Sequence, residues 1–122
     1  MYESGENYLE TIYMLSKKNG SVRSIDIARE LNFSKPSVSR AIGLLKTDNY
    51  IVVDGSGLIH LTEKGEEKAI AIYERHKVLT QFLIEFANVN KEVAEEDACR
   101  MEHIISEETF QGLKKRLEGI EK

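Results

Sequence analysis

The chain is poor in cysteine and proline, with one of each among its 122 residues. A single cysteine excludes an internal disulfide framework, so Cys99 is a buried apolar side chain, a reactive thiol or a metal ligand. No apolar run approaches the roughly 18 residues that a membrane span needs, and no signal peptide is visible behind the acidic N-terminus. We therefore expect a cytoplasmic protein with one domain or two very small ones.

The motifs of several enzyme classes are also missing. The sequence contains no HExxH motif, no glycine-rich phosphate loop and no CxxC pair. Cys99 and His103 are spaced for a nucleophile and a base on one helix, but such a helix provides neither an oxyanion hole nor a third orienting group. We therefore expect that the protein is not an enzyme.

Charge is segregated along the chain, although its formal net value is only −4. Residues 17–46 carry seven basic and two acidic side chains, whereas residues 83–110 carry eight acids against Lys91 and Arg100. One basic and one acidic region are expected where one end of a protein meets an anion and the other a cation. The alternative is two solvated faces of unequal charge.

The first half of the chain has the element order of a winged helix-turn-helix. Apolar spacing predicts a helix over residues 6–17 that ends at Asn19 and Gly20. A short helix capped by Ser24 follows over residues 25–31, and Ser34 with Pro36 starts a third helix that runs to about residue 48. The β-rich runs 50–53 and 58–61 predict a hairpin with the four-residue loop 54–57.

The second half is wholly helical in pattern. Helices are predicted from a cap at Thr62 to about residue 87, over residues 91–105, and from a cap at Ser106 onward. These helices are too few to bury their apolar faces within one chain, which favours self-association. We therefore expect a mostly α fold: a winged helix-turn-helix DNA-binding domain over residues 1–64, then an all-helical metal-binding and dimerisation domain over residues 65–122.

The third helix begins with small polar residues and a base, which suits insertion of its N-terminus into the major groove of DNA. Basic side chains of this region would contact DNA phosphates, while small polar residues and Arg40 would face the edges of the DNA bases. The predicted DNA-binding residues are Ser34, Lys35, Pro36, Ser37, Ser39, Arg40 and Lys46. His60 on the wing is interpreted as a solvated surface histidine, with a phosphate contact as the alternative. A winged helix used for protein contacts is the alternative to DNA binding.

Cys99, Glu102 and His103 stand at i, i+3 and i+4, so a helix would present all three on one face. A thiolate, a carboxylate and an imidazole form a mixed site suited to borderline divalent ions, with further donors among His76, Glu10 and Asn7. On spacing alone, a cysteine that fills a core gap beside an exposed Glu–His pair is an equal alternative.

Five segments together resemble the DtxR/MntR family of metal-dependent repressors. They are Asn7–Leu15, Ser34–Ser39, Leu61–Gly65, Arg75–His76 and, most specifically, Asp97–Ser106. The resemblance implies an N-terminal DNA-binding domain, a helical dimerisation domain with one or two metal sites per protomer, and repression of metal uptake or iron-regulated genes. Because the sequence ends at Lys122, we expect a short form without the SH3-like domain of longer members.

The resemblance also assigns candidate metal ligands. Cys99, Glu102 and His103 match the principal site of the family, and Asn7 stands where iron-type members have Met and manganese-type members have Asp. Glu10 and His76 match a second cation site of the manganese type. Thr80 replaces a carboxylate ligand of iron-type members. The sequence thus combines an iron-type cysteine with a manganese-type glutamate.

These features predict a homodimeric repressor of metal-ion homeostasis genes, activated by Fe²⁺ or Mn²⁺, with Co²⁺, Ni²⁺ and Zn²⁺ as surrogates. Its partners would be double-stranded operator DNA and a second copy of the chain, with no membrane and no small organic substrate. The main alternative is a metal-independent winged-helix regulator that senses an organic ligand. An interaction module that does not bind DNA is a further alternative.

Overall fold

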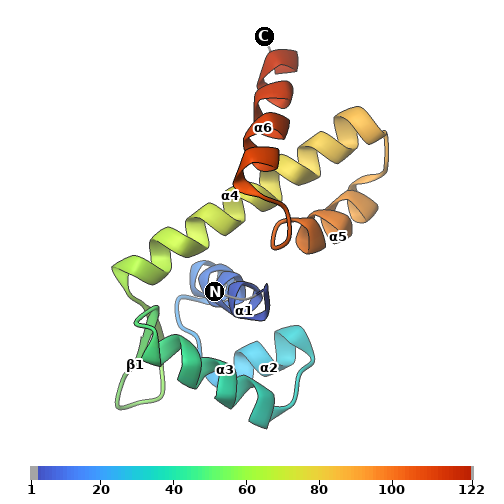
Figure 1. The fold of residues 1–122 in the computed structure, drawn as a ribbon. Coiled ribbons are helices and arrows are strands. Elements are labelled where there is room, and N and C mark those ends of the chain that lie inside the picture. Colours follow the sequence, from blue (N-terminus) through green and yellow to red (C-terminus); the bar gives the residue numbers. More distant parts are fainter. Residues whose placement is uncertain (1–2, 122) are drawn as a thin grey trace. The chain divides into compact units, whose positions relative to one another are not determined.

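The chain folds into two compact units, residues 1–70 and residues 71–122. The computed structural model describes residues 3–121, with side chains to residue 119. The first unit contains α1 (Glu3–Asn19), α2 (Ser24–Leu31), α3 (Lys35–Thr47), β1 (Ile51–Val53) and β2 (Ile59–Leu61) (Figure 1). α4 (Glu63–Ala87) begins in the first unit and ends in the second, where α5 (Lys91–Met101) and α6 (Glu107–Glu121) follow. Within residues 3–121, none of the helices has the length and apolar character of a membrane span.

The first unit is a winged helix-turn-helix built around α1, which packs against α2, α3 and β2. Its most deeply buried side chains come from α1, α2, α3, both strands and the segment before α2: Leu9, Ile12, Val22, Ile27, Val38, Ile51 and Ile59. α1 ends where the sequence predicts, at Asn19, and Gly20 adopts a positive φ of 81°. Glycine adopts this conformation without steric cost, which makes it the usual residue after a helix end.

The start of α3 is confirmed, but two details of the neighbouring helices differ from expectation. The Ser34 hydroxyl accepts a hydrogen bond from the Ser37 backbone N–H, as a capping serine does. The cap of α2 is Arg23 rather than Ser24, because the Asp26 carboxylate accepts the Arg23 backbone N–H at 2.8 Å. Leu44, which matches the apolar periodicity of α3, is 68% exposed, whereas Val38 and Leu45 are buried.

The wing is the antiparallel pair of β1 and β2, in which Val52 lies opposite His60. The strands are each one residue shorter than predicted, three residues long. The outer edge of β2 also bonds to the segment before α2, since the Ile59 N–H donates to the Val22 carbonyl at 2.8 Å. The wing is therefore anchored to the start of the helix-turn-helix.

The junction between the wing and α4 is closely packed. The Thr62 hydroxyl accepts the Gly65 N–H and donates to the Asn49 carbonyl, which confirms the predicted cap. The Lys64 ammonium donates to the Asp48 carbonyl at 2.9 Å and lies 4.3 Å from the centre of the Tyr50 ring. Together these contacts attach the start of α4 to the end of α3.

The second unit joins the end of α4 to α5 and α6. Its buried side chains include Ile72, Leu79, Ala94, Ala98 and Phe110. The caps are regular: Asn90 accepts the Val93 N–H, and Ser106 accepts the Thr109 N–H as the sequence predicts. Polar contacts between α4 and α6 include the ion pair of Glu74 with Lys114, at 2.6 Å.

α5 ends earlier than predicted. The helix stops at Met101 rather than continuing to residue 105, and a turn of residues 102–106 leads into α6. Apolar periodicity continues through Ile104 and Ile105, which is why the sequence indicates one longer helix. Carbonyl groups in this turn accept hydrogen bonds from the Arg75 side chain of α4 instead.

Candidate metal centre and nucleic-acid interface

A buried carboxylate between two imidazoles lies in the second unit. The Glu102 side chain is 0% exposed, and its Oε2 lies 2.9 Å from His76 Nδ1. When Glu102 is ionised its oxygen can only accept, and His76 Nδ1 is then the donor of this hydrogen bond. The other carboxylate oxygen, Oε1, lies 3.2 Å from His103 Nε2.

The three side chains come from two parts of the second unit. His76 is in α4, whereas Glu102 and His103 follow the last residue of α5. The His103 side chain is 7% exposed and that of His76 is 23% exposed. Burial of a negatively charged carboxylate costs free energy unless a positive charge compensates it. A carboxylate and two imidazoles are also a ligand set that binds divalent transition metals.

Cys99 does not share the burial of Glu102. It lies within α5 and is exposed, whereas Glu102 lies beyond the helix end and is buried. α5 is assigned only to Met101, but Glu102 keeps helical backbone angles and its N–H donates to the Ala98 carbonyl at 2.9 Å, so the common face of Cys99, Glu102 and His103 stays a prediction. The alternative, a cysteine filling a core gap beside an exposed Glu–His pair, is wrong, because Cys99 is exposed and Glu102 is buried.

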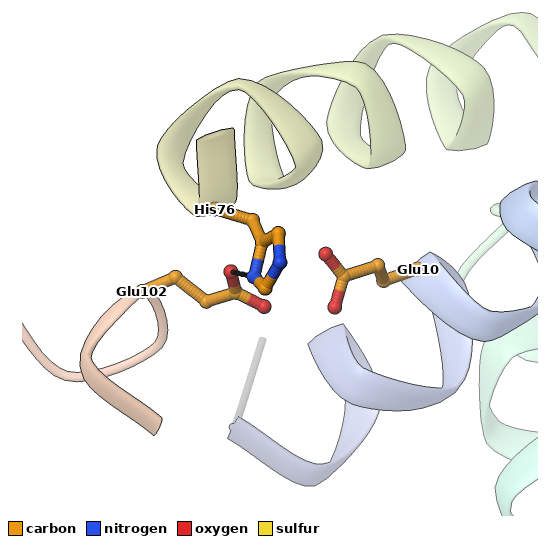
Figure 2. A group of neighbouring side chains, drawn as sticks. All are labelled: Glu10, His76 and Glu102. Atoms are coloured by element: carbon orange, nitrogen blue, oxygen red, sulfur yellow. Dashed lines mark hydrogen bonds and ion pairs between the residues drawn. The ribbon is translucent and has the colours of Figure 1, made fainter. Parts of the chain in front are cut away.

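The remaining predicted ligands, Asn7 and Glu10, belong to α1 in the first unit. Glu10 is 6% exposed, and Asn7 is half-buried one turn earlier. Figure 2 draws Glu10 with His76 and Glu102, and its dashed line marks the hydrogen bond between the last two. Both residues of this hydrogen bond belong to the second unit.

The start of α3 presents a polar, basic surface. The predicted DNA-binding residues Ser34, Lys35, Pro36, Ser39, Arg40 and Lys46 are exposed, and Ser37 is half-buried. Ser37 is also engaged locally, since its hydroxyl accepts a hydrogen bond from that of Ser34 at 2.9 Å. The N-terminal half of α3 therefore places Lys35 and Arg40 on the surface of the first unit, as DNA-reading helices require, and Lys46 is exposed in the last turn.

The wing loop is organised by Asp54. Its Oδ1 accepts the backbone N–H groups of Ser56 and Leu58, and its Oδ2 lies 2.9 Å from His60 Nε2. The hydrogen bond from His60, then that from Leu58, lowers the pKa of the Asp54 carboxyl below 3.8. His60 is a surface histidine, as expected, with its side chain 53% exposed, and it also pairs with the Asp54 carboxylate. The Arg23 guanidinium also donates to the Ser56 carbonyl and so holds the loop.

Two profiles of one protein family match nearly the whole sequence. The profile described as the N-terminal DNA binding domain of iron dependent repressors matches residues 1–57. The profile described as their metal binding and dimerisation domain matches residues 62–122. The chain belongs to the iron-dependent repressor family. The fold class expected from the sequence, a winged helix-turn-helix followed by a helical domain, is that of this DtxR/MntR group.

One relative is an HTH-type transcriptional regulator of Methanocaldococcus jannaschii. It is 36% identical, and the match covers 93% of this chain and 92% of the relative. The iron-dependent repressor IdeR of Mycobacterium tuberculosis is 32% identical over 96% of this chain and 51% of its own length. The solved structure of the manganese regulator SloR superposes with a TM-score of 0.83 at 29% identity, covering 93% of this chain and 53% of that one. The chain thus spans about half the length of IdeR and SloR.

Sequence reasoning missed two polar centres of this repressor-family chain. The only sequence signal for the hydrogen bonds that Asp54 accepts in the wing is the turn-forming composition of the segment Asp54–Gly57. Arg75 was part of the family resemblance, but nothing in its local pattern indicates contacts to residues 27 and more positions away. Those contacts depend on how α4 packs against the turn after α5.

Proposed function

We propose that the chain is a homodimeric repressor whose binding to operator DNA is activated by a divalent transition metal. The observation that carries this proposal is the buried Glu102 carboxylate with His76 and His103 at its two oxygens. Membership of a family with DNA-binding and metal-binding domains supports both halves of it. The names of the relatives IdeR and SloR refer to iron and manganese respectively, which supports Fe²⁺ or Mn²⁺ as the natural activator.

The donor set fits such an ion. A carboxylate and two imidazoles inside one unit provide the oxygen and nitrogen donors that Mn²⁺, Fe²⁺, Co²⁺, Ni²⁺ and Zn²⁺ accept. We infer that the complete ligand set is Asn7, Glu10, His76, Cys99, Glu102 and His103, used in one or two sites. The bound ion would supply positive charge that stabilises the buried carboxylates.

Ligands contributed by both units would couple metal binding to DNA binding. Asn7 and Glu10 belong to the first unit and the other four residues to the second. An ion held by both would favour those arrangements of the units in which all its ligands meet, and so shift a population of conformations. In a dimer, this restriction would set the separation of two α3 helices, which must match half-sites about 34 Å or a multiple apart.

We propose the exposed start of α3 as the DNA-reading surface. Lys35, and Lys46 in the last turn of α3, would contact phosphates. Arg40 and the small residues Ser34, Pro36, Ser37 and Ser39 would lie toward base edges. Dimerisation through the second unit is supported by its exposed large apolar side chains, Phe86, Val93 and Ile104. Exposed side chains of this kind favour burial against a partner.

The experiment is DNA binding by chelator-treated protein across a metal series. Duplexes are first selected from a random library in the presence of Mn²⁺ or Fe²⁺ under anaerobic conditions. Affinity for the selected duplex is then measured with each of Mn²⁺, Fe²⁺, Co²⁺, Ni²⁺ and Zn²⁺ and with chelator. We expect at least one ion to raise the affinity tenfold or more.

Variants of the buried site sharpen this test. Glu102→Ala and His103→Ala should abolish the metal-dependent increase and leave dimerisation unchanged, whereas the exposed Glu108→Ala should behave like the wild type. Affinity that does not change between chelator and every ion would overturn metal activation and favour the metal-independent regulator. Absence of duplex binding even at low salt would favour an interaction module.

A further inference from the structure

Arg75 of α4 reaches the backbone of the turn that carries Glu102 and His103. Its side chain is 19% exposed, and Nη1 donates to the carbonyl oxygens of Glu102 at 3.2 Å and Ile105 at 2.9 Å. Carbonyl groups at and beyond a helix end have no partner within the helix. Arg75 supplies a donor to two of them from outside the turn.

The same guanidinium also contacts the start of α6. Nη2 donates to Glu107 Oε2 at 2.9 Å, and the guanidinium carbon lies 5.2 Å from the centre of the buried Phe110 ring. Hydrogen bonds from Gln111 and then from Arg75 lower the pKa of the Glu107 carboxyl. One side chain therefore holds the turn of residues 102–106 at both of its ends.

Two adjacent residues of α4 thus hold Glu102 in different ways. His76 contacts its carboxylate, and Arg75 contacts its backbone carbonyl. We propose that Arg75 is a positioning residue for the metal centre: it fixes the backbone from which Glu102 and His103 project. The inference rests on the proposed function, because it concerns the affinity of that site for a divalent ion.

The size of the expected effect follows from the behaviour of groups that orient metal ligands. Loss of a contact that orients a metal ligand typically weakens metal binding 10- to 100-fold. The ligand is then no longer held in its binding geometry and has to be ordered when the metal binds. Arg75 donates to neutral carbonyls and to Glu107, and it is itself cationic and not a ligand. Its removal should therefore lower the affinity for the metal ion without removing a metal ligand.

The chain provides a matched control for general loosening of the helices. Lys114 of α6 pairs with Glu74 of α4, the residue next to Arg75, at 2.6 Å. This ion pair joins the same two helices, and no described contact links it to the turn of residues 102–106. Lys114→Met removes an α4–α6 tie and leaves the contacts of the turn in place.

The test is an anaerobic Co²⁺ titration of the full chain, followed by the visible absorption of bound Co²⁺ and by competition with a chelator. Arg75→Met should bind Co²⁺ 10- to 100-fold more weakly than the wild type and show a changed absorption spectrum. Arg75→Lys, which keeps the charge but lacks the planar fork of donors, should give an intermediate affinity. Lys114→Met should match the wild type in both affinity and spectrum.

Thermal unfolding without metal shows which variants are folded, because a folded variant unfolds cooperatively. Only such variants enter the comparison of Co²⁺ affinities and spectra, so a loss of affinity reports positioning and not a loss of folding. If Arg75→Met does not fold, Arg75→Lys decides the question on the same two readouts. Co²⁺ affinity and spectrum equal to the wild type in a folded Arg75 variant would overturn the positioning role alone. A wild-type chain that binds no Co²⁺ would overturn the proposed function, and the positioning role with it.

Discussion

The backbone carbonyl oxygen of Tyr50 occupies the space in which a β-carbon on Gly65 would lie. Gly65 is in the first turn of α4, and its N–H donates to the Thr62 hydroxyl at 3.0 Å. Tyr50 in turn accepts the Thr62 backbone N–H. The close approach therefore belongs to the junction that attaches α4 to the wing.

Gly65→Ala should destabilise the protein, although alanine is the better helix former. The added carbon meets backbone rather than a flexible side chain, so the junction has to shift, at a cost of about 1–3 kcal/mol. Urea denaturation measures the free energy of unfolding. Gly112→Ala is the control, because no atom beyond the local backbone of α6 lies within 4 Å of an added β-carbon, and the change should stabilise by up to ~1 kcal/mol. Equal stability of the two variants would contradict the close approach.

The Asp54 carboxyl should titrate below pH 3.8, because hydrogen bonds from His60 and the Leu58 backbone lower its pKa. A lowered carboxyl pKa stabilises the folded state above the unfolded pKa, and this contribution is lost as the pH falls through the folded one. Carbon-13 NMR of the carboxyl group gives the midpoint directly. His60→Ala should raise the midpoint towards 3.8, and the two backbone donors should keep it from rising fully. A midpoint unaffected by His60→Ala would refute the pairing.

Arg40 and Lys46 should differ in what they contribute to DNA binding. Arg40→Ala should weaken binding to the selected duplex by about 1–3 kcal/mol and weaken binding to random duplexes less, as loss of a base contact does. Lys46→Ala should weaken both alike and reduce the salt slope by about 1. Lys91→Ala, which removes an exposed base from α5, serves as the control. Equal losses for both duplexes in Arg40→Ala would make Arg40 a phosphate contact.

Metal preference should depend on Cys99 and Asn7. A thiolate favours softer ions, and an amide at position 7 lacks the charge that hard cations prefer, so the wild type should bind Fe²⁺, Co²⁺ or Zn²⁺ more tightly than Mn²⁺. Cys99→Glu combined with Asn7→Asp should shift activation towards Mn²⁺. Anaerobic titrations of both proteins with each ion measure the change. If Mn²⁺ activates both proteins best and equally, neither residue sets the preference.

Local signals predicted most elements of the fold, because several helices begin at a residue whose side chain caps them. Ser34, Thr62 and Ser106 all cap the helices that the sequence assigns to them. The exceptions are tertiary in origin. Leu44 matches the apolar period of α3 but lies outside the core. α5 ends early, at the turn whose carbonyl groups accept hydrogen bonds from the Arg75 side chain.

The candidate site was only partly accessible to sequence reasoning. Spacing selected Glu102 and His103, and His76, already a candidate donor, matched the family's second cation site; the structure places His76 in contact with Glu102. Spacing alone could not show that Glu102 is fully buried while Cys99 is exposed, since burial depends on where the helix ends. The contacts of Arg75 were inaccessible for the same reason: they join positions about one quarter of the chain apart.

The hydrogen bond from Ile59 to Val22 has a consequence for solubility. A hairpin that has to remain exposed offers unpaired N–H and C=O groups, to which strands of other molecules can add. Here the Val22 carbonyl takes an outward N–H of β2, and neither strand exceeds three residues. Very short, partly covered edges are poor templates for strand addition. The wing can therefore project from the surface without seeding intermolecular sheets as the protein accumulates in the cell.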